Sequence, residues 1–491
     1  MRIGPTGIFR FAPAILLLPV FILLLAGCSD EDSPLKNDDP PVITDLEVWY
    51  VSDAASGAGD GSSWNDAFTS LQVAVDYAGD GDMVWVAAGS YFSPEPGDSS
   101  VPVLSMKAGV DMYGGFSTTD TELSDRDPDA NRTILDGENR VRHVVIGADF
   151  ARLDGFVIQS GYAFGSYPDN CGGGMLNHRV SPVVENCIFT SNDAAFHGAG
   201  MANIYASPLV RDCVFRINSA ANNGAGVYND DQNGIDGNPV FESCVFGPGN
   251  SCRFGAGMYN SWCEVAVNNC FFHDNLANHN GGGMYNTSSK VLVMSSFFRE
   301  NRAFSGAGVY MNGIAGDDST KLLNCLIETN TAYVSGGGVY LLKSSSILIN
   351  CTIAENSAIY GGGISCWESE AEFTNSIIWG NVAHNDWPAI EIGTDTAPEI
   401  TCCDIDQDGY GRESDGSADA DGNIRLDPLF AAGSRGDWYI SHTEAGQAQD
   451  SPCLDAGTLT GVDFWLVGYM TTRTDGMPDS GRIDLGFHYI P

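Results

Sequence analysis

Basic residues are scarce in this 491-residue chain, which has 23 Lys and Arg against 63 Asp and Glu and a formal net charge of −40. A chain this acidic cannot follow a phosphate backbone, so nucleic acid is excluded as a partner. The shortage also weighs against enzymes that cleave acidic glycans by β-elimination, because they need a basic side chain and a cation beside the uronate. Only five residues are Lys, and no Lys/Arg pair recurs at the repeat spacing described below with acids for Ca²⁺ beside it.

Cysteine is also limited. The 14 Cys are too few to build a disulfide scaffold, and they are spread along the whole chain. Proline is unexceptional, whereas Gly reaches 59 residues and 43% of the chain is hydrophobic. This balance excludes a disordered or collagen-like chain and leaves a folded, glycine-rich protein.

One long apolar run stands at the start of the chain. It extends from Phe11 to Ala26, follows Arg2 and Arg10, and ends in Leu25-Ala26-Gly27-Cys28. The pattern is typical of secretory signals and resembles the bacterial lipoprotein signal, which implies cleavage before an acylated Cys28. A membrane span is the weaker alternative, because the run is short and interrupted by proline. Removal of residues 1–27 would leave a mature charge of 21 − 63 = −42.

Residues 28–45 are polar, acidic and proline-rich, which predicts a tether. Ser29 after the Cys resembles outer-membrane sorting, so we expect an exported, lipid-anchored protein at the outer membrane. The acidic cluster Asp30–Asp32 resembles the surface-export signal of some lipoproteins, and its alternative is a solvated linker with no sorting role.

A repeat organises the middle of the chain. A Gly-x-Gly-apolar tetrad recurs at intervals of 26, 26, 31, 26, 25, 30 and 25 residues, and polar insertions at 230–238 and 312–319 account for the two long intervals. The tetrads begin at Gly172, Gly198, Gly224, Gly255, Gly281, Gly306, Gly336 and Gly361.

A second phrase follows each tetrad, as in Asn186-Cys187-Ile188-Phe189, and an Asn stands three residues beyond its last apolar residue. Units of this length, with short β runs, glycine turns and no helical stretch, fit coils of a parallel β-solenoid stacked about 4.8 Å apart. Like residues then form ladders, and Asn at a turn can satisfy backbone groups of the next coil. We predict an all-β, right-handed parallel β-helix.

The paired phrases resemble the repeats of the chlamydial polymorphic outer-membrane proteins and of related pectin-lyase-like β-helix proteins. The resemblance covers residues 48–491, from Asp60-Gly61-Ser62-Ser63-Trp64 to the closing Asp484-Leu485-Gly486-Phe487-His488-Tyr489. It implies an N-terminal cap and first coils at 46–160, with a short capping helix within 65–77. Regular repeats would follow at 161–400, and terminal coils with a closing segment at 401–491.

Six cysteines share one column of the repeat, with Ser296 and Ser376 filling it elsewhere. Disulfides or a metal chain are one interpretation. Serine in the same column favours a ladder of buried thiols acting as small hydrophobic side chains. The column holds Cys187, Cys213, Cys244, Cys270, Cys325 and Cys351, whereas Cys403 and six others lie outside it.

An acidic D-x-D-x-D-G phrase predicts a structural calcium site, because hard Ca²⁺ prefers alternate carboxylates and a backbone carbonyl. Arg412 and a shorter last acid weaken the match, and a variable polar loop is the alternative. The expected ligands are Asp404, Asp406, Asp408, Tyr410 and Asp415.

Glycan-binding candidates lie beside the tetrads. A column containing Tyr228, Tyr259 and Tyr285 faces outward and could stack on sugar rings, or could pack on itself. A mixed group near the first insertion is the other candidate, and its alternative is an ordinary wet turn. This group contains His178, Arg179, Tyr205, Asp230, Asp231 and Trp262.

No catalytic constellation is evident, and the fold hosts lyases, hydrolases and adhesins alike. We therefore favour a non-catalytic, adhesin-like surface lipoprotein that binds polysaccharide or another cell-surface component. The alternatives are a polysaccharide lyase or glycoside hydrolase acting near 178–262, and a spacer that displays nothing.

Overall fold

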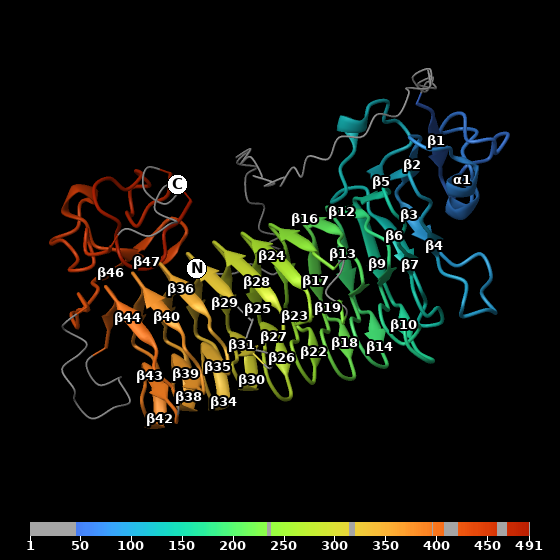
Figure 1. The fold of residues 1–491 in the computed structure, drawn as a ribbon. Helices are drawn as coiled ribbons and strands as arrows, with labels where there is room; N and C mark the ends of the chain where they lie inside the picture. The colour runs from blue at the N-terminus through green and yellow to red at the C-terminus, as the bar shows by residue number, and fades with distance from the viewer. Residues whose placement is uncertain are drawn as a thin grey trace, which may run out of the picture. The chain divides into compact units, whose positions relative to one another are not determined.

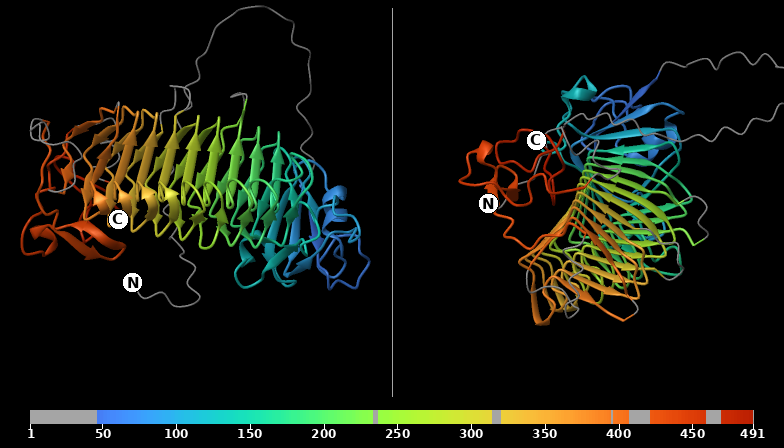
Figure 2. Two further views of the ribbon diagram at one scale, coloured as in Figure 1. Left: turned by 90° about the horizontal axis from the view of Figure 1, so that it is seen from below. Right: turned by 60° about the vertical axis from the view of Figure 1, so that its left-hand side comes forward.

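The structure, a computed structural model, describes residues 46–232, 237–313, 320–394, 396–406, 421–458 and 469–490. Residues 46–491 form one compact unit in which short strands stack coil upon coil into long parallel sheets (Figures 1 and 2). The predicted all-β parallel β-helix is confirmed. Among the described residues, no helix is long and apolar enough to cross a membrane.

Each regular coil passes through four sheets in turn. The thirteen-stranded sheet contains β1 (Val48–Val51), β2 (Met83–Ala87), β5 (Asp111–Phe116), β8 (Arg152–Asp154), β12 (Val183–Glu185), β16 (Leu209–Arg211), β20 (Val240–Glu242), β24 (Glu264–Asn268), β28 (Lys290–Met294), β32 (Lys321–Leu323), β36 (Ile347–Ile349), β40 (Glu372–Thr374) and β44 (Glu399–Thr401). The twelve-stranded sheet contains β3 (Gly89–Tyr91), β6 (Thr133–Asp136), β9 (Phe156–Gln159), β13 (Ile188–Thr190), β17 (Val214–Arg216), β21 (Val245–Phe246), β25 (Phe271–His273), β29 (Phe297–Arg299), β33 (Leu326–Glu328), β37 (Thr352–Ala354), β41 (Ile377–Trp379) and β45 (Asp404–Ile405).

The chain then enters two further sheets before it returns to the first. The nine-stranded sheet contains β10 (Tyr162–Ala163), β14 (Asp193–Ala194), β18 (Ser219–Ala220), β22 (Ser251–Cys252), β26 (Leu276–Ala277), β30 (Arg302–Ser305), β34 (Thr331–Ser335), β38 (Ser357–Tyr360) and β42 (Val382–Asp386). The eleven-stranded sheet contains β4 (Leu104–Ser105), β7 (Val145–Ile146), β11 (Met175–His178), β15 (Met201–Ile204), β19 (Val227–Asp230), β23 (Met258–Ser261), β27 (Met284–Thr287), β31 (Val309–Asn312), β35 (Val339–Leu342), β39 (Ile364–Trp367) and β43 (Ile390–Ile392).

Identical side chains stack inside the coils because equivalent residues are paired in register. Phe189 pairs with Phe215, and their ring centroids lie 4.8 Å apart with the planes within 8°. The stack continues through Phe246, Phe272 and Phe298, all fully buried. Buried aromatic rings make a large contribution to such a core.

The Asn-Cys phrase forms the bend between the thirteen- and twelve-stranded sheets. Its first residue takes a left-handed backbone conformation, with φ of 51° at Asn186, 52° at Asn269 and 53° at Asn324. Asn tolerates this conformation better than most side chains do.

A ladder of buried asparagines at the next turn confirms the predicted backbone support. Asn275, for example, donates from Nδ2 to the Phe246 carbonyl at 2.8 Å and to Asn301 Oδ1 at 2.9 Å. Sequence reasoning missed a second, internal ladder, in which each Nδ2 donates to the next Oδ1 at 2.7–2.8 Å. This ladder contains Asn177, Asn203, Asn229, Asn260 and Asn286.

The predicted cap helix is present but shorter, as α1 (Leu71–Tyr77). Ser70 caps its N-terminus by accepting a hydrogen bond from the Val73 amide. Leu71, Ala74 and Val75 are buried, and the helix contacts β1 and β2 of the first coils.

The closing segment, described at residues 421–458 and 469–490, breaks the repeat. It contains the antiparallel pair β46 (Phe430–Gly433) and β47 (Gly436–Ile440) and a 3₁₀ turn at Thr443–Ala445; another 3₁₀ turn lies near the N-terminus at Leu123–Asp125. Its apolar side chains cover the outer face of the twelve-stranded sheet at β33 and β41.

Bend asparagines also hold the closing segment in place. Asn324 accepts from the His488 amide at 2.7 Å and donates to the His488 carbonyl at 2.9 Å. Asn350 Nδ2 donates to the Asp484 carbonyl at 3.0 Å. The bend column therefore has a second role in the last coils, where it binds the chain that covers it.

Candidate functional site

The predicted edge group is only partly assembled on the surface. His178 and Arg179 are exposed at the end of β11, and the Arg179 guanidinium lies 5.3 Å from the Tyr205 ring centroid. Partial burial and the neighbouring Arg179 lower the pKa of His178. Trp262 is 46% exposed. These four residues remain available to a ligand.

Asp230 and Asp231 are buried, in contrast to the rest of this group. Burial raises the pKa of Asp230, although the hydroxyls of Ser261, Tyr228 and Tyr167 partly oppose this shift. The Gly237 amide donates to Asp231 at 3.0 Å. Both carboxylates therefore face the interior of this edge in the described structure.

The tyrosine column is a self-packed ladder, which was one of its two interpretations. Tyr259 and Tyr285 stack with centroids 5.0 Å apart and planes within 5°, and Tyr310 follows at 4.8 Å. Tyr228 is 5% and Tyr285 is 8% exposed. The ring faces that a sugar would need are already covered by neighbouring rings.

The cysteine column consists of buried free thiols, and all 13 described cysteines are unpaired. Burial raises the pKa of the Cys270 thiol, which keeps it protonated. One assignment was wrong: Cys403, placed outside the column, continues it, because the Ser376 amide donates to its sulfur at 3.4 Å.

Only two of the five expected calcium ligands are described. Asp404 is buried, and its carboxylate accepts from the Leu426 amide at 3.2 Å and from Cys453 Sγ at 3.1 Å. Asp406 accepts from the Gly380 amide at 3.3 Å. Asp408, Tyr410 and Asp415 lie outside the described residues, so calcium binding here stays a prediction.

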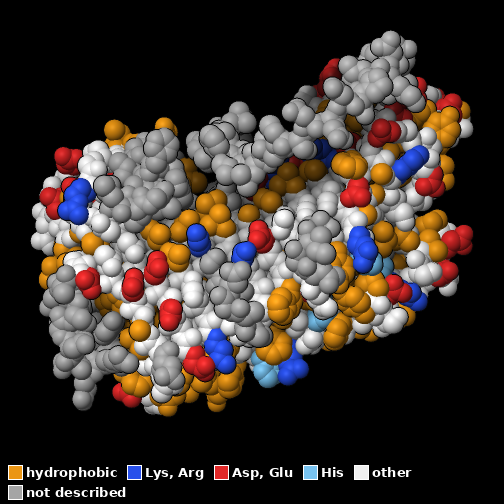
Figure 3. Space-filling model, viewed as in Figure 1, with side chains coloured by type: hydrophobic (Ala, Val, Ile, Leu, Met, Phe, Trp, Pro, Cys, Tyr) orange, Lys and Arg blue, Asp and Glu red, His pale blue; other side chains and the backbone are white. Residues whose placement is uncertain are grey.

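An exposed stripe on the nine-stranded sheet is the candidate binding surface that sequence reasoning missed. It lies just before the tetrad in six consecutive coils, and we call it the edge stripe. In Figure 3, hydrophobic, cationic and histidine side chains gather along the lower edge, where Figure 1 places β26 to β34. The edge stripe consists of the exposed Phe196, Arg253, His279, Phe304 and Tyr333 and the half-buried Asn222.

Backbone contacts place these side chains one above another. The His279 amide donates to the Arg253 carbonyl at 2.9 Å, and the Phe304 amide donates to the His279 carbonyl. Phe304 is 45% and Tyr333 is 71% exposed, with their ring centroids 5.9 Å apart. In the sequence, the stripe could have been found by comparing the residues two or three positions before each tetrad.

The edge stripe also carries free positive charge on an acidic protein. Arg253 in the stripe and Arg302, two residues before Phe304 in β30, are exposed, and neither forms an ion pair within the described parts of the chain. Aromatic faces close to cations can bind a chain that has both apolar and anionic groups.

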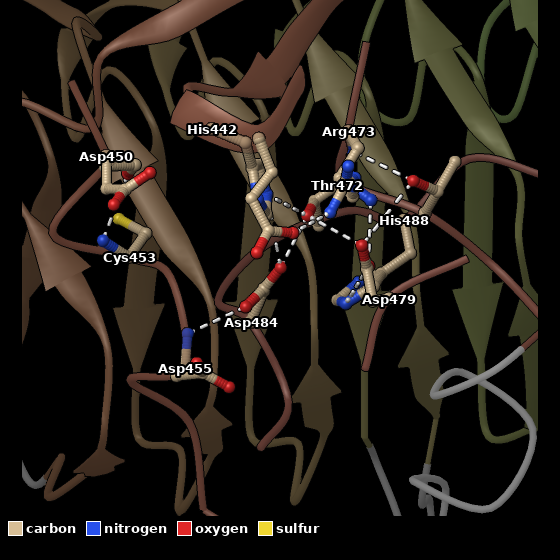
Figure 4. A network of polar contacts seen from close by, with 12 residues as sticks. His442, Asp450, Cys453, Asp455, Thr472, Arg473, Asp479, Asp484 and His488 are labelled. Carbon is tan, nitrogen blue, oxygen red and sulfur yellow. Dashed lines mark hydrogen bonds and ion pairs between the residues drawn. The ribbon is translucent and has the colours of Figure 1, made fainter. Parts of the chain in front are cut away.

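A buried polar network lies within the closing segment (Figure 4). In the described residues, His442, Asp479 and Asp484 are the only three potential metal ligands whose donor atoms all lie within 4.8 Å of one another. Burial raises the pKa of Asp479 to about 8 and that of Asp484 to about 6. Sequence reasoning missed this group because its members belong to no repeat.

Comparisons with known proteins agree with the architecture. A family model described as a right-handed beta helix region matches residues 210–378, so the solenoid contains a right-handed β-helix. No match was found among curated proteins.

Several solved structures are similar at low identity. Pectate lyase Pel9A is 11% identical with a TM-score of 0.43, over 90% of this chain and 96% of that one. A rhamnogalacturonan lyase is 13% identical with a TM-score of 0.38, over 86% and 98%. PfbA, a surface adhesin of Streptococcus pneumoniae, is 9% identical with a TM-score of 0.30, over 67% and 89%.

Proposed function

We propose that this protein is a lipid-anchored outer-membrane lipoprotein whose β-helix binds an extracellular polysaccharide without cleaving it. The edge stripe is the observation that carries this proposal. Its exposed rings and cations lie on neighbouring coils about 4.8 Å apart, so a polymer lying along the sheet contacts several of these side chains at once. Each contact is weak alone, and the affinity comes from their number.

An anionic polysaccharide is the preferred ligand. Phe304 and Tyr333 offer apolar ring faces for sugars, and Arg253 and Arg302 offer charge for carboxylate or sulfate groups. The net charge of −40 repels anions elsewhere, which directs such a ligand to this stripe.

The test is retention of the soluble chain from Ser29 on a panel of acidic and neutral polysaccharides, with product formation followed in the same samples. The double variant Phe304→Ala, Tyr333→Ala should weaken binding about tenfold or more, about 1.4 kcal/mol. Phe150→Ala is the matched control, because Phe150 is 87% exposed but lies away from the stripe. Equal binding by the double variant and the control would contradict the edge stripe as the binding site. Loss of binding in Trp262→Ala alone would instead place the site at the group that contains Trp262.

The anchor is tested separately. Replacement of Cys28 by Ala should release the protein from the membrane fraction and abolish labelling with a radioactive fatty acid. Unchanged membrane association would contradict the lipoprotein proposal without affecting the glycan test.

One observation favours the enzymatic alternative. Partial burial raises the pKa of Asp212 to about 6 although this residue remains exposed, and Arg211 beside it pairs with Glu242 at 2.7 Å and Glu185 at 3.4 Å. A carboxyl group that stays partly protonated near neutral pH is what a glycoside hydrolase needs as its acid. New reducing ends in the binding assay that disappear in Asp212→Asn would establish this alternative.

A further inference from the structure

We propose that a proton held between Asp479 and His488 makes the closing segment a pH-sensitive cover, which loosens from the twelve-stranded sheet when Asp479 loses that proton. The inference is independent of glycan binding and starts from the buried network in Figure 4. Asp479 and Asp484 have 4% and 2% of their surface exposed, and His488 has none. Water therefore cannot stabilise a charge on these side chains, and only their neighbours can do so.

His488 presents an acceptor to Asp479. Its Nδ1 lies 2.9 Å from the Gly486 carbonyl, which can only accept, so Nδ1 carries the hydrogen. Nε2 of the neutral ring then has a lone pair, and it has no hydrogen-bond partner among the described residues. This atom lies 3.5 Å from Asp479 Oδ2. Two acceptors face each other unless Asp479 is protonated, so its proton removes both the mismatch and the buried charge.

Thr472 does not supply that proton. Its hydroxyl lies 2.5 Å from Asp484, 3.1 Å from His442 Nε2 and 3.3 Å from Asp479, and it has a single hydrogen to donate. The shortest contact assigns this hydrogen to Asp484. The hydroxyl also occupies the space between His442, Asp479 and Asp484, so protons rather than a metal ion connect this group.

Asp484 is a neighbouring carboxylate that favours a protonated Asp479. Burial is the main cause that raises the pKa of Asp479 to about 8, and repulsion from Asp484 is the second, whereas the Thr472 amide and hydroxyl oppose the shift. Burial likewise raises the pKa of Asp484 to about 6, against the hydrogen bond from the Asp455 amide. At neutral pH, Asp484 is therefore the charged carboxylate of the pair and Asp479 is the protonated one.

The basic side chains near the pair do not cancel this effect. Arg473 forms ion pairs with Glu444 and Asp475, each at 2.7 Å, so much of its charge is already compensated. Burial and Arg473 lower the pKa of His442, and burial lowers the pKa of His488 to about 4. The acidic groups that face His442 are Asp450, Asp475 and Glu444. Both imidazoles are neutral at pH 7 and cannot balance a second carboxylate.

His488 connects this network to the coils. Its backbone amide and carbonyl bond to Asn324 of the bend column, and Phe487 beside it packs in one cluster with Leu326 of β33. A charged Asp479 beside His488 therefore weakens the contacts through which the closing segment covers the sheet.

The direction of the pH dependence follows from the protons bound in each state. In an exposed chain the pKa of Asp is about 3.9 and that of His is about 6.5. Between these values and the raised pKa of Asp479, opening releases its proton, while both histidines are neutral above pH 6.5 in either state. Opening therefore becomes up to about tenfold more favourable per pH unit from about pH 6.5 to about pH 8. Below this range His442 and His488 take up protons on opening, which opposes the effect of the carboxyl groups.

Hydrogen exchange of the full mature chain, followed by mass spectrometry, tests this inference. Protection at residues 484–489, corrected for the intrinsic effect of pH on exchange, should fall by up to about 30-fold between pH 6.5 and 8. The coil peptide 264–272 should keep its protection. Protection of residues 484–489 that stays constant or rises across this range would overturn the proposal, whether or not any variant folds.

Two variants and a control assign the effect. Asp479→Asn is neutral at every pH, and its amide can accept from Thr472 and donate to His488, so residues 484–489 should keep their pH 6.5 protection at pH 8. Glu328→Gln removes a carboxyl beneath the closing segment whose pKa is also raised by burial, and it should keep the slope of the parent chain. Asp437→Asn, at an exposed carboxyl in β47, is the control and should keep that slope too. A parent-like slope in Asp479→Asn, or loss of the slope in either other variant, would overturn the proposal.

Discussion

The repeated coils and the closing segment bury polar side chains in opposite ways. In the coils, Asn275 meets Asn250 and Asn301, which are copies of itself in the adjacent turns. In the closing segment, Asp479 and His488 each occur once, and Asp479 Oδ2 lies 3.5 Å from His488 Nε2. In the repeat, a buried polar side chain bonds to the same residue in the adjacent coil. A buried polar side chain that occurs only once needs a partner of different chemistry.

The two regions therefore differ in role. A ladder continues wherever the phrase recurs in the sequence, so the residues of a ladder stabilise the fold. The closing segment and the edge stripe depart from the ladders, and the proposed polysaccharide contacts the edge stripe. Three experiments test this difference between the two regions, from the largest expected effect to the smallest.

The largest effect should come from interrupting the coil ladder. Asn275→Ala leaves the buried Phe246 carbonyl without its side-chain donor and removes the bond to Asn301. We expect the free energy of unfolding to fall by about 3 kcal/mol in denaturant titrations. Asn278→Ala in the same coil, where the side chain is exposed, should change it by less than about 0.5 kcal/mol. Similar values for the two variants would show that the ladder contributes little.

A smaller effect should come from releasing the closing segment. Asn324→Ala removes both hydrogen bonds to the His488 backbone, at an expected cost of about 2 kcal/mol. Hydrogen exchange should then quicken at residues 485–489. Asn269→Ala is the matched control, because Asn269 has the same left-handed backbone, at φ 52° against 53°, and its side chain bonds only to Ser243 among the described residues. Equal exchange in both variants would contradict docking through the bend column.

The smallest effect near neutral pH is a pH dependence in the coils. His197 is buried in a stack on Tyr228, with centroids 4.3 Å apart, and burial lowers its pKa to about 3. In the unfolded chain the pKa is about 6.5, so protons bind the unfolded state preferentially between these values. Stability is complete above pH 6.5 and should fall by up to about 1.4 kcal/mol per pH unit below it.

His197→Phe keeps the stack and cannot be protonated, so its stability should fall less steeply between pH 6.5 and 4.5. The exposed His384 supplies the control, since His384→Phe should keep the slope of the parent chain. Parallel curves for His197→Phe and the parent would exclude His197 as the group responsible.

Periodic features could be predicted well. The tetrads located the coils, the Asn-Cys phrase located the bends, and serine in the cysteine column indicated buried thiols. Cys403 was missed because it follows the last tetrad. The tyrosines were expected to face outward, and they do lie beyond the core, but period alone cannot show that neighbouring rings cover them.

The sequence alone predicts the solenoid, because a parallel stack forces equivalent residues into register, and their chemistry is then visible as a column. The places where non-equivalent residues meet follow only from the folded structure. His442 is tens of residues from Asp479 and Asp484 and the three share no period, yet the closing segment folds them into one buried network. Exposure along the edge stripe was decided in the same way, by which side chains the surrounding loops leave uncovered.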